Sequence, residues 1–127
     1  MPQRTELIFG VGTFIVKPGK EDEFLSAWKE FANWTSNQFK NARSGAYLMQ
    51  DIDNPQMFMV TGTWNSLEDI KAWQARPEFQ DWMKRERELC DHFEPHNMKL
   101  VAEVTNYPTK AEENENIKTR ERIKQDK

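Results

Sequence analysis

Residues 45–79 read GAYLMQDIDNPQMFMVTGTWNSLEDIKAWQARPEF, and this stretch decides the fold class. Two β-prone runs, 47–52 and 57–64, are separated by the turn tetrapeptide Asp-Asn-Pro-Gln, which predicts a β-hairpin. A helix is expected to begin at Ser66, because Asp69 follows three residues later and completes a capping box. Pro77 restarts the helical path at a first-turn position, where its missing N–H costs little.

The segments on either side of this stretch extend the pattern. Residues 7–16 are apolar on both alternating sets, which predicts a strand covered on both faces. Apolar residues recur at helical spacing over residues 20–39 and again over residues 66–93, where Glu-Pro ends the second helical region. Residues 97–107 alternate well enough to predict a last strand.

The resulting order is β-α-β-β-α-β, the order of the ferredoxin-like α+β fold. This fold has a four-stranded antiparallel sheet with helices on one face, so its other face is bare. Because the first strand is apolar on both sides, we infer that a second copy covers the bare face, giving a homodimer that pairs sheet to sheet. The domain is expected to span residues 1–107. Residues 108–127 form a charged tail, expected to be either a marginal solvated helix or an arm around a partner subunit, anchored by Ile117 and Ile123.

Composition argues against several classes of partner. The chain has 127 residues and a formal charge of −3, which gives no electrostatic reason to approach nucleic acid or an anionic membrane. There is no signal-like N-terminus and no run of roughly 20 apolar residues, so we expect a soluble, cytoplasmic protein. Cys90 is the only cysteine, which excludes an intrachain disulfide and a cysteine cluster for a structural metal.

Turn and cap motifs spread over much of the chain resemble one known family. The motifs are VKPGKEDEF at 16–24, GAY at 45–47, DIDNP at 51–55, WNS at 64–66 and RPEF at 76–79. Their order resembles that of the antibiotic biosynthesis monooxygenase family of dimeric α+β barrels, over about residues 7–104. The resemblance implies the same fold and homodimer, and an oxygenase that acts without a cofactor on a small aromatic substrate such as a phenol or quinol.

No sequence motif for a metal, a nucleotide or a catalytic triad is present. The candidate catalytic groups are therefore hydrogen-bond donors that stabilise an enolate-like oxyanion. They are the indole N–H of Trp64, the hydroxyl of Tyr47 and the amides of Asn33 and Asn65. Trp64 ends the third expected strand, where the family has a recurrent tryptophan near its substrate cavity. It is expected either to line a pocket or simply to pack in the core.

The predicted substrate-binding residues are Trp34, Trp73, Gly10, Gly12 and Gly62. Trp34 lies at the edge of the first helix's apolar stripe, open to a ligand or to another subunit. The glycines of the first strand mark the close approach of a backbone or of a ligand. By the resemblance, Trp73 stands where the haem-degrading branch has its histidine ligand, and Gly62 replaces a frequent glutamate. An apolar aromatic ligand is therefore favoured, and neither a cofactor nor a metal is expected.

Two other functions stay open. One is a non-catalytic dimeric module that binds a small apolar molecule or a protein partner, and the other is a haem-binding or haem-degrading protein. His92 and His96 are the only histidines, and solvated or structural roles are favoured over metal binding, with general base work left open. Cys90 lies among apolar residues, so its thiol is expected to have a raised pKa and low reactivity.

Overall fold

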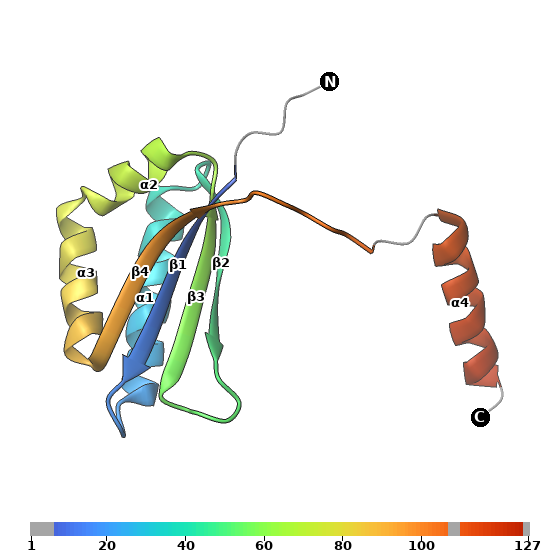
Figure 1. Cartoon of the computed structure of the whole chain (residues 1–127), viewed down its shortest axis with the longest axis horizontal. Helices are drawn as coiled ribbons and strands as arrows, with labels where there is room; N and C mark the ends of the chain where they lie inside the picture. The colour runs from blue at the N-terminus through green and yellow to red at the C-terminus, as the bar shows by residue number, and fades with distance from the viewer. Residues whose placement is uncertain (1–6, 107–109, 126–127) are drawn as a thin grey trace.

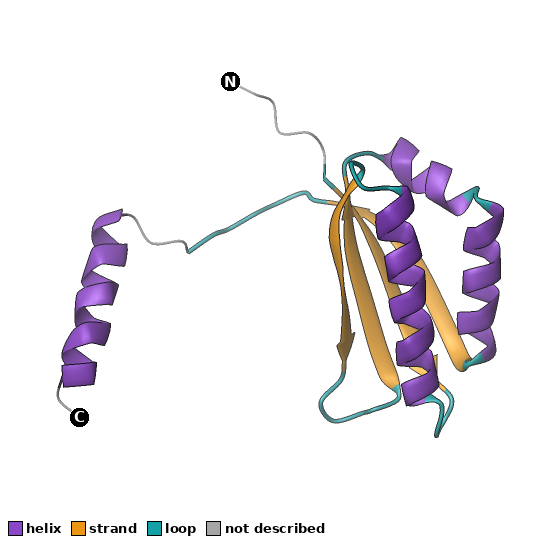
Figure 2. Cartoon of the chain, turned by 180° about the vertical axis from the view of Figure 1, so that it is seen from behind, coloured by secondary structure: helices purple, strands orange, loops and turns teal. Residues whose placement is uncertain are grey.

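The computed structural model describes residues 7–106 and 110–125. Its elements are β1 (Ile8–Val16), α1 (Glu21–Gln38), β2 (Arg43–Gln50), β3 (Met57–Trp64), α2 (Leu67–Gln74), α3 (Pro77–Glu88), β4 (Cys90–Lys99) and α4 (Lys110–Gln125). The strands form one antiparallel sheet in the order β2-β3-β1-β4. Helices α1, α2 and α3 cover one face of this sheet (Figures 1 and 2). The expected ferredoxin-like α+β fold is confirmed.

The local signals of residues 45–79 produce the predicted elements. In the turn between β2 and β3, Oδ1 of Asp51 accepts hydrogen bonds from the backbone N–H groups of Asp53 and Asn54, at 2.8 and 2.9 Å. The hydroxyl of Ser66 accepts from the N–H at position 69, at 3.1 Å, and caps α2. Pro77 is the first residue of α3. The hairpin and both helix starts are therefore confirmed, but the hairpin's first strand covers Arg43–Gln50 instead of residues 47–52, because Asp51 already forms the turn.

The main core lies between the sheet and the helices. Every second residue of β1 faces the helices, and Phe14 and Val16 of this set are fully buried. They pack against Phe24 of α1 and Phe58 of β3. No helix in the described ranges is long and apolar enough to cross a membrane.

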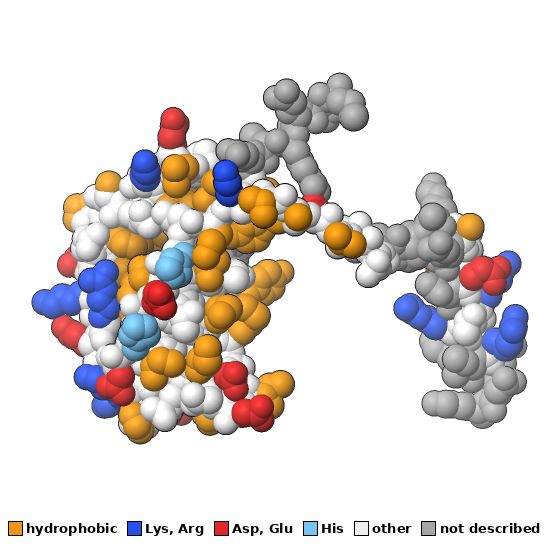
Figure 3. Space-filling view, viewed as in Figure 1, with side chains coloured by type: hydrophobic (Ala, Val, Ile, Leu, Met, Phe, Trp, Pro, Cys, Tyr) orange, Lys and Arg blue, Asp and Glu red, His pale blue; other side chains and the backbone are white. Residues whose placement is uncertain are grey.

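The opposite face of the sheet carries a wide apolar surface, which Figure 3 shows in front. Its exposed large apolar side chains on the strands are Tyr47, Met49, Met59 and Met98. None of α1, α2 and α3 lies on this side (Figure 1). The apolar character of both faces, predicted from the first strand, is therefore confirmed.

The last strand differs from the sequence prediction. The helical pattern predicts a helix to residue 93 and a strand over residues 97–107, whereas α3 ends at Glu88 and β4 covers Cys90–Lys99. Pro95 lies within β4, which is tolerated because β4 is an edge strand and a missing N–H there leaves no neighbour unpaired. The sequence does not separate the two because a short apolar run fits a helical and a strand period equally well.

The charged tail contains helix α4, which Figure 1 shows apart from the sheet. Ile117, one of the two expected anchors, is exposed. The side chain of Ile123 and the expected domain boundary at residues 107 and 108 lie outside the described residues.

Candidate functional site

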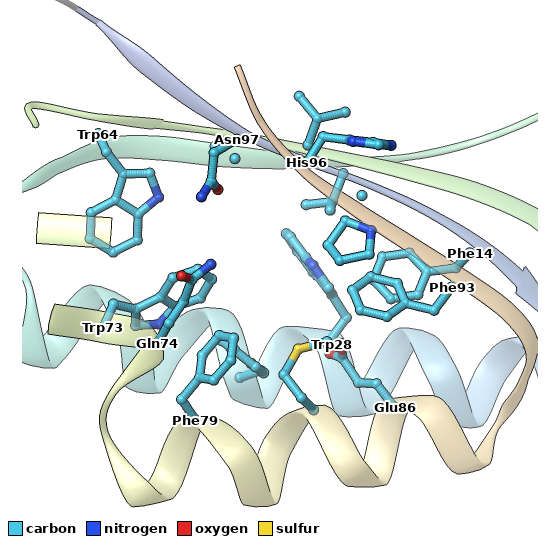
Figure 4. A pocket seen from close by; sticks show the side chains of 18 of the residues that line it. Phe14, Trp28, Trp64, Trp73, Gln74, Phe79, Glu86, Phe93, His96 and Asn97 are labelled. Carbon is cyan, nitrogen blue, oxygen red and sulfur yellow. The ribbon is translucent and has the colours of Figure 1, made fainter. Parts of the chain in front are cut away.

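A cavity of about 200 Å³ lies between the sheet and the helices that cover it. Residues of β1, β3 and β4 face residues of α1, α2 and α3 across it (Figure 4). Its aromatic lining consists of Phe14, Trp28, Phe31, Trp64, Trp73, Phe79 and Phe93. Ligand sites are concave and mostly apolar, and those for drug-sized molecules measure roughly 300–1,000 Å³. The cavity therefore suits one small aromatic molecule.

Three glycines widen the sheet side of the cavity. Gly10 and Gly12 of β1 and Gly62 of β3 all line it. A Cβ at residue 12 would lie 3.1 Å from Cγ1 of Val60 and 3.3 Å from Cε1 of Phe93, which is tighter than ordinary contact. The structure thus brings the three predicted glycines together at the cavity, and their part in ligand binding stays a prediction.

Trp64 is buried at one end of the cavity. Its ring lies 4.9 Å from that of Trp73, centroid to centroid. Its indole N–H points into the cavity (Figure 4) and has no hydrogen-bond partner within the described ranges. Because a buried indole N–H usually finds a partner, this donor is available to a ligand.

Trp73 also lines the cavity, but its own donor serves the fold. Its indole N–H donates to Oγ1 of Thr35 at 3.0 Å, and Thr35 is fully buried. The ring of Phe79 packs edge-on against Trp73, with centroids 4.6 Å apart. Trp73 therefore contributes an apolar face to the wall and no free hydrogen-bond donor.

Four predicted site residues lie away from this cavity. Tyr47 is 73% exposed on the open face of the sheet. Asn33 is exposed on α1. The side-chain amide of Asn65 donates to the backbone carbonyl of Asn41, in the loop between α1 and β2, at 2.7 Å. Trp34 packs under the guanidinium of Arg76, which lies 5.6 Å from its ring centroid. None of the four lines the cavity.

Arg43, at the start of β2, lines the cavity although sequence reasoning missed it. A register shift between Arg43 and Gly45 pairs Arg43 with Trp64, so that it faces the helices. The guanidinium carbon lies 5.5 Å from the ring centroid of Trp64 and 5.9 Å from that of Trp73. Burial lowers the pKa of Arg43 to about 10, so the group is still charged at neutral pH.

Glu86 of α3 is a second group that sequence reasoning missed. It is 2% exposed and lines the cavity at the end away from Trp64 (Figure 4). Its Oε1 atom is buried without a hydrogen-bond partner. Burial raises the pKa of Glu86 to about 8, and the positive charge of Arg85 offsets this only in part. The carboxyl group can therefore gain or lose a proton near neutrality.

By the register of β4 with β1, His92, Glu94 and His96 share the open face of the sheet, and His96 also borders the cavity (Figure 4). The Nε2 atoms of His92 and His96 are 3.8 and 3.3 Å from the carboxylate oxygens of Glu94. Cys90 begins β4, and burial raises the pKa of its thiol to about 12, in agreement with the prediction of low reactivity. Within the described ranges, no group of three His, Cys, Asp or Glu side chains is placed to hold a metal ion.

Comparison with known proteins extends these observations. Residues 8–85 match the family model described as antibiotic biosynthesis monooxygenase. No curated protein matches the chain in sequence. Among solved structures, SnoaB from Streptomyces nogalater, described as a cofactor-independent oxygenase, is 18% identical with a TM-score of 0.67. That similarity covers 81% of this chain and 99% of SnoaB.

Two further solved structures share the architecture. A conserved protein from Methanosarcina mazei Go1 is 20% identical with a TM-score of 0.67, over 76% of this chain and 94% of that protein. A protein from Chloroflexus aurantiacus J-10-fl that carries the same family name is 23% identical with a TM-score of 0.62, over 78% and 97% of the two chains. At these identities the likeness supports the shared fold.

Proposed function

Because the chain belongs to the antibiotic biosynthesis monooxygenase family, we propose that it catalyses the cofactor-independent oxygenation of a small aromatic substrate of the phenol or quinol type. The observation that carries this proposal is the aromatic-lined cavity with the N–H of Trp64 directed into it. SnoaB, which has the same fold, is described as a cofactor-independent oxygenase. This supports the proposed reaction class.

The proposed reaction requires from the protein only an enclosed site with a proton acceptor and a hydrogen-bond donor. A phenol and dioxygen yield a quinone and water, so the substrate supplies all the electrons, and one oxygen atom enters the ring while the other leaves as water. The protein must take up the phenolic proton, stabilise the oxyanion and exclude bulk water. The N–H of Trp64 is the donor for the oxyanion. Glu86 lies at the opposite end of the cavity (Figure 4), so its ionised form accepts a proton from the far hydroxyl of a quinol and not from the oxygen that Trp64 binds; burial raises its pKa to about 8.

Replacing Trp64 by Phe is expected to lower the oxygenation rate by roughly 10²–10³-fold, the usual effect of losing one oxyanion donor. The ring remains to pack against Trp73, so the fold should persist. The measurement is oxygen uptake with a panel of hydroquinones. Trp82→Phe is the matched control, because Trp82 does not line the cavity. No uptake across the panel, or equal rates in the native protein and Trp64→Phe, would contradict the proposal.

A second candidate function is passive binding of an aromatic molecule. It is favoured by the positions of Asn33 and Asn65, since neither amide lines the cavity and fewer donors than expected are available for an oxyanion. Quenching of tryptophan fluorescence by aromatic compounds that are recovered without oxidation would support this function over the first.

We also propose that the chain forms a homodimer through the open face of the sheet, since that face carries exposed apolar side chains and two-fold dimers are the commonest oligomers. Met59→Glu, on a central strand of that face, is expected to convert the dimer to a monomer at micromolar concentration because it would bury a charge. Leu67→Glu, on α2, is the control and should stay dimeric. Light scattering after gel filtration measures both, and a monomeric native protein would refute the dimer.

A further inference from the structure

The guanidinium of Arg43 is a partly buried positive charge at the cavity. Its Nε atom is buried and has no hydrogen-bond partner. Within the described ranges no carboxylate forms an ion pair with it. Its neighbours are the rings of Trp64 and Trp73, whose faces attract a cation but do not neutralise it. A charge held out of water without a partner is costly, so this arrangement points to a ligand that supplies the anion.

Two features of the backbone keep the guanidinium in this place. The extra residue between Arg43 and Gly45 forms a β-bulge, which turns Arg43 from the open face to the cavity face. Across the sheet, a Cβ at Gly62 would lie 3.0 Å from Nη2 and 3.4 Å from Nε of Arg43. A side chain at residue 62 would therefore displace the guanidinium. The bulge directs the side chain of Arg43 toward the cavity, and Gly62 leaves room for its guanidinium there.

The rest of the cavity adds little negative charge at neutral pH. Burial raises the pKa of Glu86 to about 8, so its carboxyl group is mostly protonated there. Arg87 lines the cavity as an exposed residue and is positive. Gln74 and Asn97 contribute neutral amides (Figure 4). The cavity therefore combines aromatic walls with a positive potential, which favours a flat anion.

We propose that the cavity binds an aromatic carboxylate, with its ring between the aromatic walls and its carboxylate on the guanidinium of Arg43. A carboxylate matches the planar fork of a guanidinium through two parallel hydrogen bonds. It is already ionised at neutral pH, so it needs no proton transfer in order to bind. The inference rests on the proposed function for the reaction at this site, and the substrate is then a hydroxylated aromatic acid.

The test compares 2,5-dihydroxybenzoate, which carries both a quinol ring and a carboxylate, with its neutral amide. Tryptophan fluorescence in the absence of oxygen measures binding without turnover. We expect the native protein to bind the acid at least about 10-fold more tightly than the amide, as for a charge-assisted bidentate pair. Arg43→Met keeps the length of the side chain without its charge and should bind both compounds equally. Arg43→Lys keeps the charge without the fork and should show an intermediate preference.

The control is Lys84→Gln, which removes an exposed positive charge outside the cavity and should keep the native preference for the acid. A second measurement guards against misfolding: ligand-free Arg43→Met should unfold at a higher temperature than the native protein, because an unbalanced charge is gone. Equal affinity of the native protein for acid and amide, or an undiminished preference in Arg43→Met, would overturn the proposal.

The same compounds separate this inference from the proposed oxygenation. Tight binding of the acid without oxygen uptake from any quinol would support the anion site and overturn the oxygenase. Oxygen uptake from hydroquinone without any preference for the acid would overturn the anion site and leave the oxygenase standing.

Discussion

The free energy of unfolding is expected to fall as pH rises from 4.5 to about 8, and Glu86→Gln is expected to remove most of that fall. Burial raises the pKa of Glu86 because the ionised carboxylate loses its hydration and Oε1 has no hydrogen-bond partner. Between those two pH values the folded chain holds a proton that the unfolded chain has released. Folding is therefore favoured by this group below 4.5, and the contribution is lost as pH rises through the folded-state pKa.

The size of this effect follows from the shift itself. One pKa unit corresponds to about 1.4 kcal/mol, so the loss across the whole range amounts to several kcal/mol. That is a large part of the roughly 5–15 kcal/mol that stabilises an ordinary domain. The amide introduced by Glu86→Gln carries no titrating proton. The free energy of unfolding of the variant, compared with that of the native protein, should therefore increase from the acid end of the range to the alkaline end.

Urea denaturation at both ends of this pH range, at one fixed protein concentration, measures the prediction. Glu88→Gln is the matched control, since Glu88 is an exposed carboxylate at the end of the same helix and should keep the native slope. Parallel pH profiles for the native protein and Glu86→Gln would show that Glu86 is not the group responsible.

The proposed function gives a reason why such an unfavourable group is kept. A protein optimised for stability alone would carry an uncharged side chain here, and stabilising changes at functional positions commonly cost activity. Glu86→Gln should therefore stabilise the protein at alkaline pH and slow oxygenation. These opposite effects distinguish a proton acceptor from a residue that only packs.

The fold could be predicted from the sequence because its signals are local. The hairpin depends on the turn at residues 53–56, and the starts of α2 and α3 depend on Ser66 and Pro77. The end of α3 and the start of β4 could not be placed, since the apolar residues on either side fit both periods. Only the pairing of β4 with β1, a contact distant in sequence, decides between the two.

The candidate site was less predictable for a related reason. By simple alternation Arg43 shares a face with Tyr47, which points away from the helices, and only the bulge reverses it. Gly45, with φ of 148°, is the one local sign of that irregularity. Glu86 stands in the charged run KRERE at 84–88, where nothing in the sequence separates a buried carboxylate from exposed ones. Trp64 was predictable because its position at a strand end is itself a local feature.

Phe24→Ala is expected to lower the free energy of unfolding by about 3–5 kcal/mol, the usual cost of removing a buried phenylalanine ring. Phe24 is 0% exposed, and its ring centroid lies 4.9 Å from that of Phe14 and 5.0 Å from that of Phe58. Its loss leaves a cavity between α1 and strands β1 and β3, and these elements cannot move together enough to fill it. Phe14 also stacks on Phe93 at 4.6 Å, and both rings line the cavity. The truncation should therefore loosen the cavity wall and weaken ligand binding as well.

The adjacent residue supplies the control. Leu25 is 37% exposed on α1, so Leu25→Ala removes half as many apolar carbons as Phe24→Ala, and these are already partly hydrated. Its cost should be below about 1.5 kcal/mol. Denaturation of both variants at the same protein concentration separates this effect from any shift in oligomeric state. Equal losses in the two variants would mean that the helical side of the sheet is not the main core, and the cavity would then lack the rigid wall that positions Trp64 and Glu86.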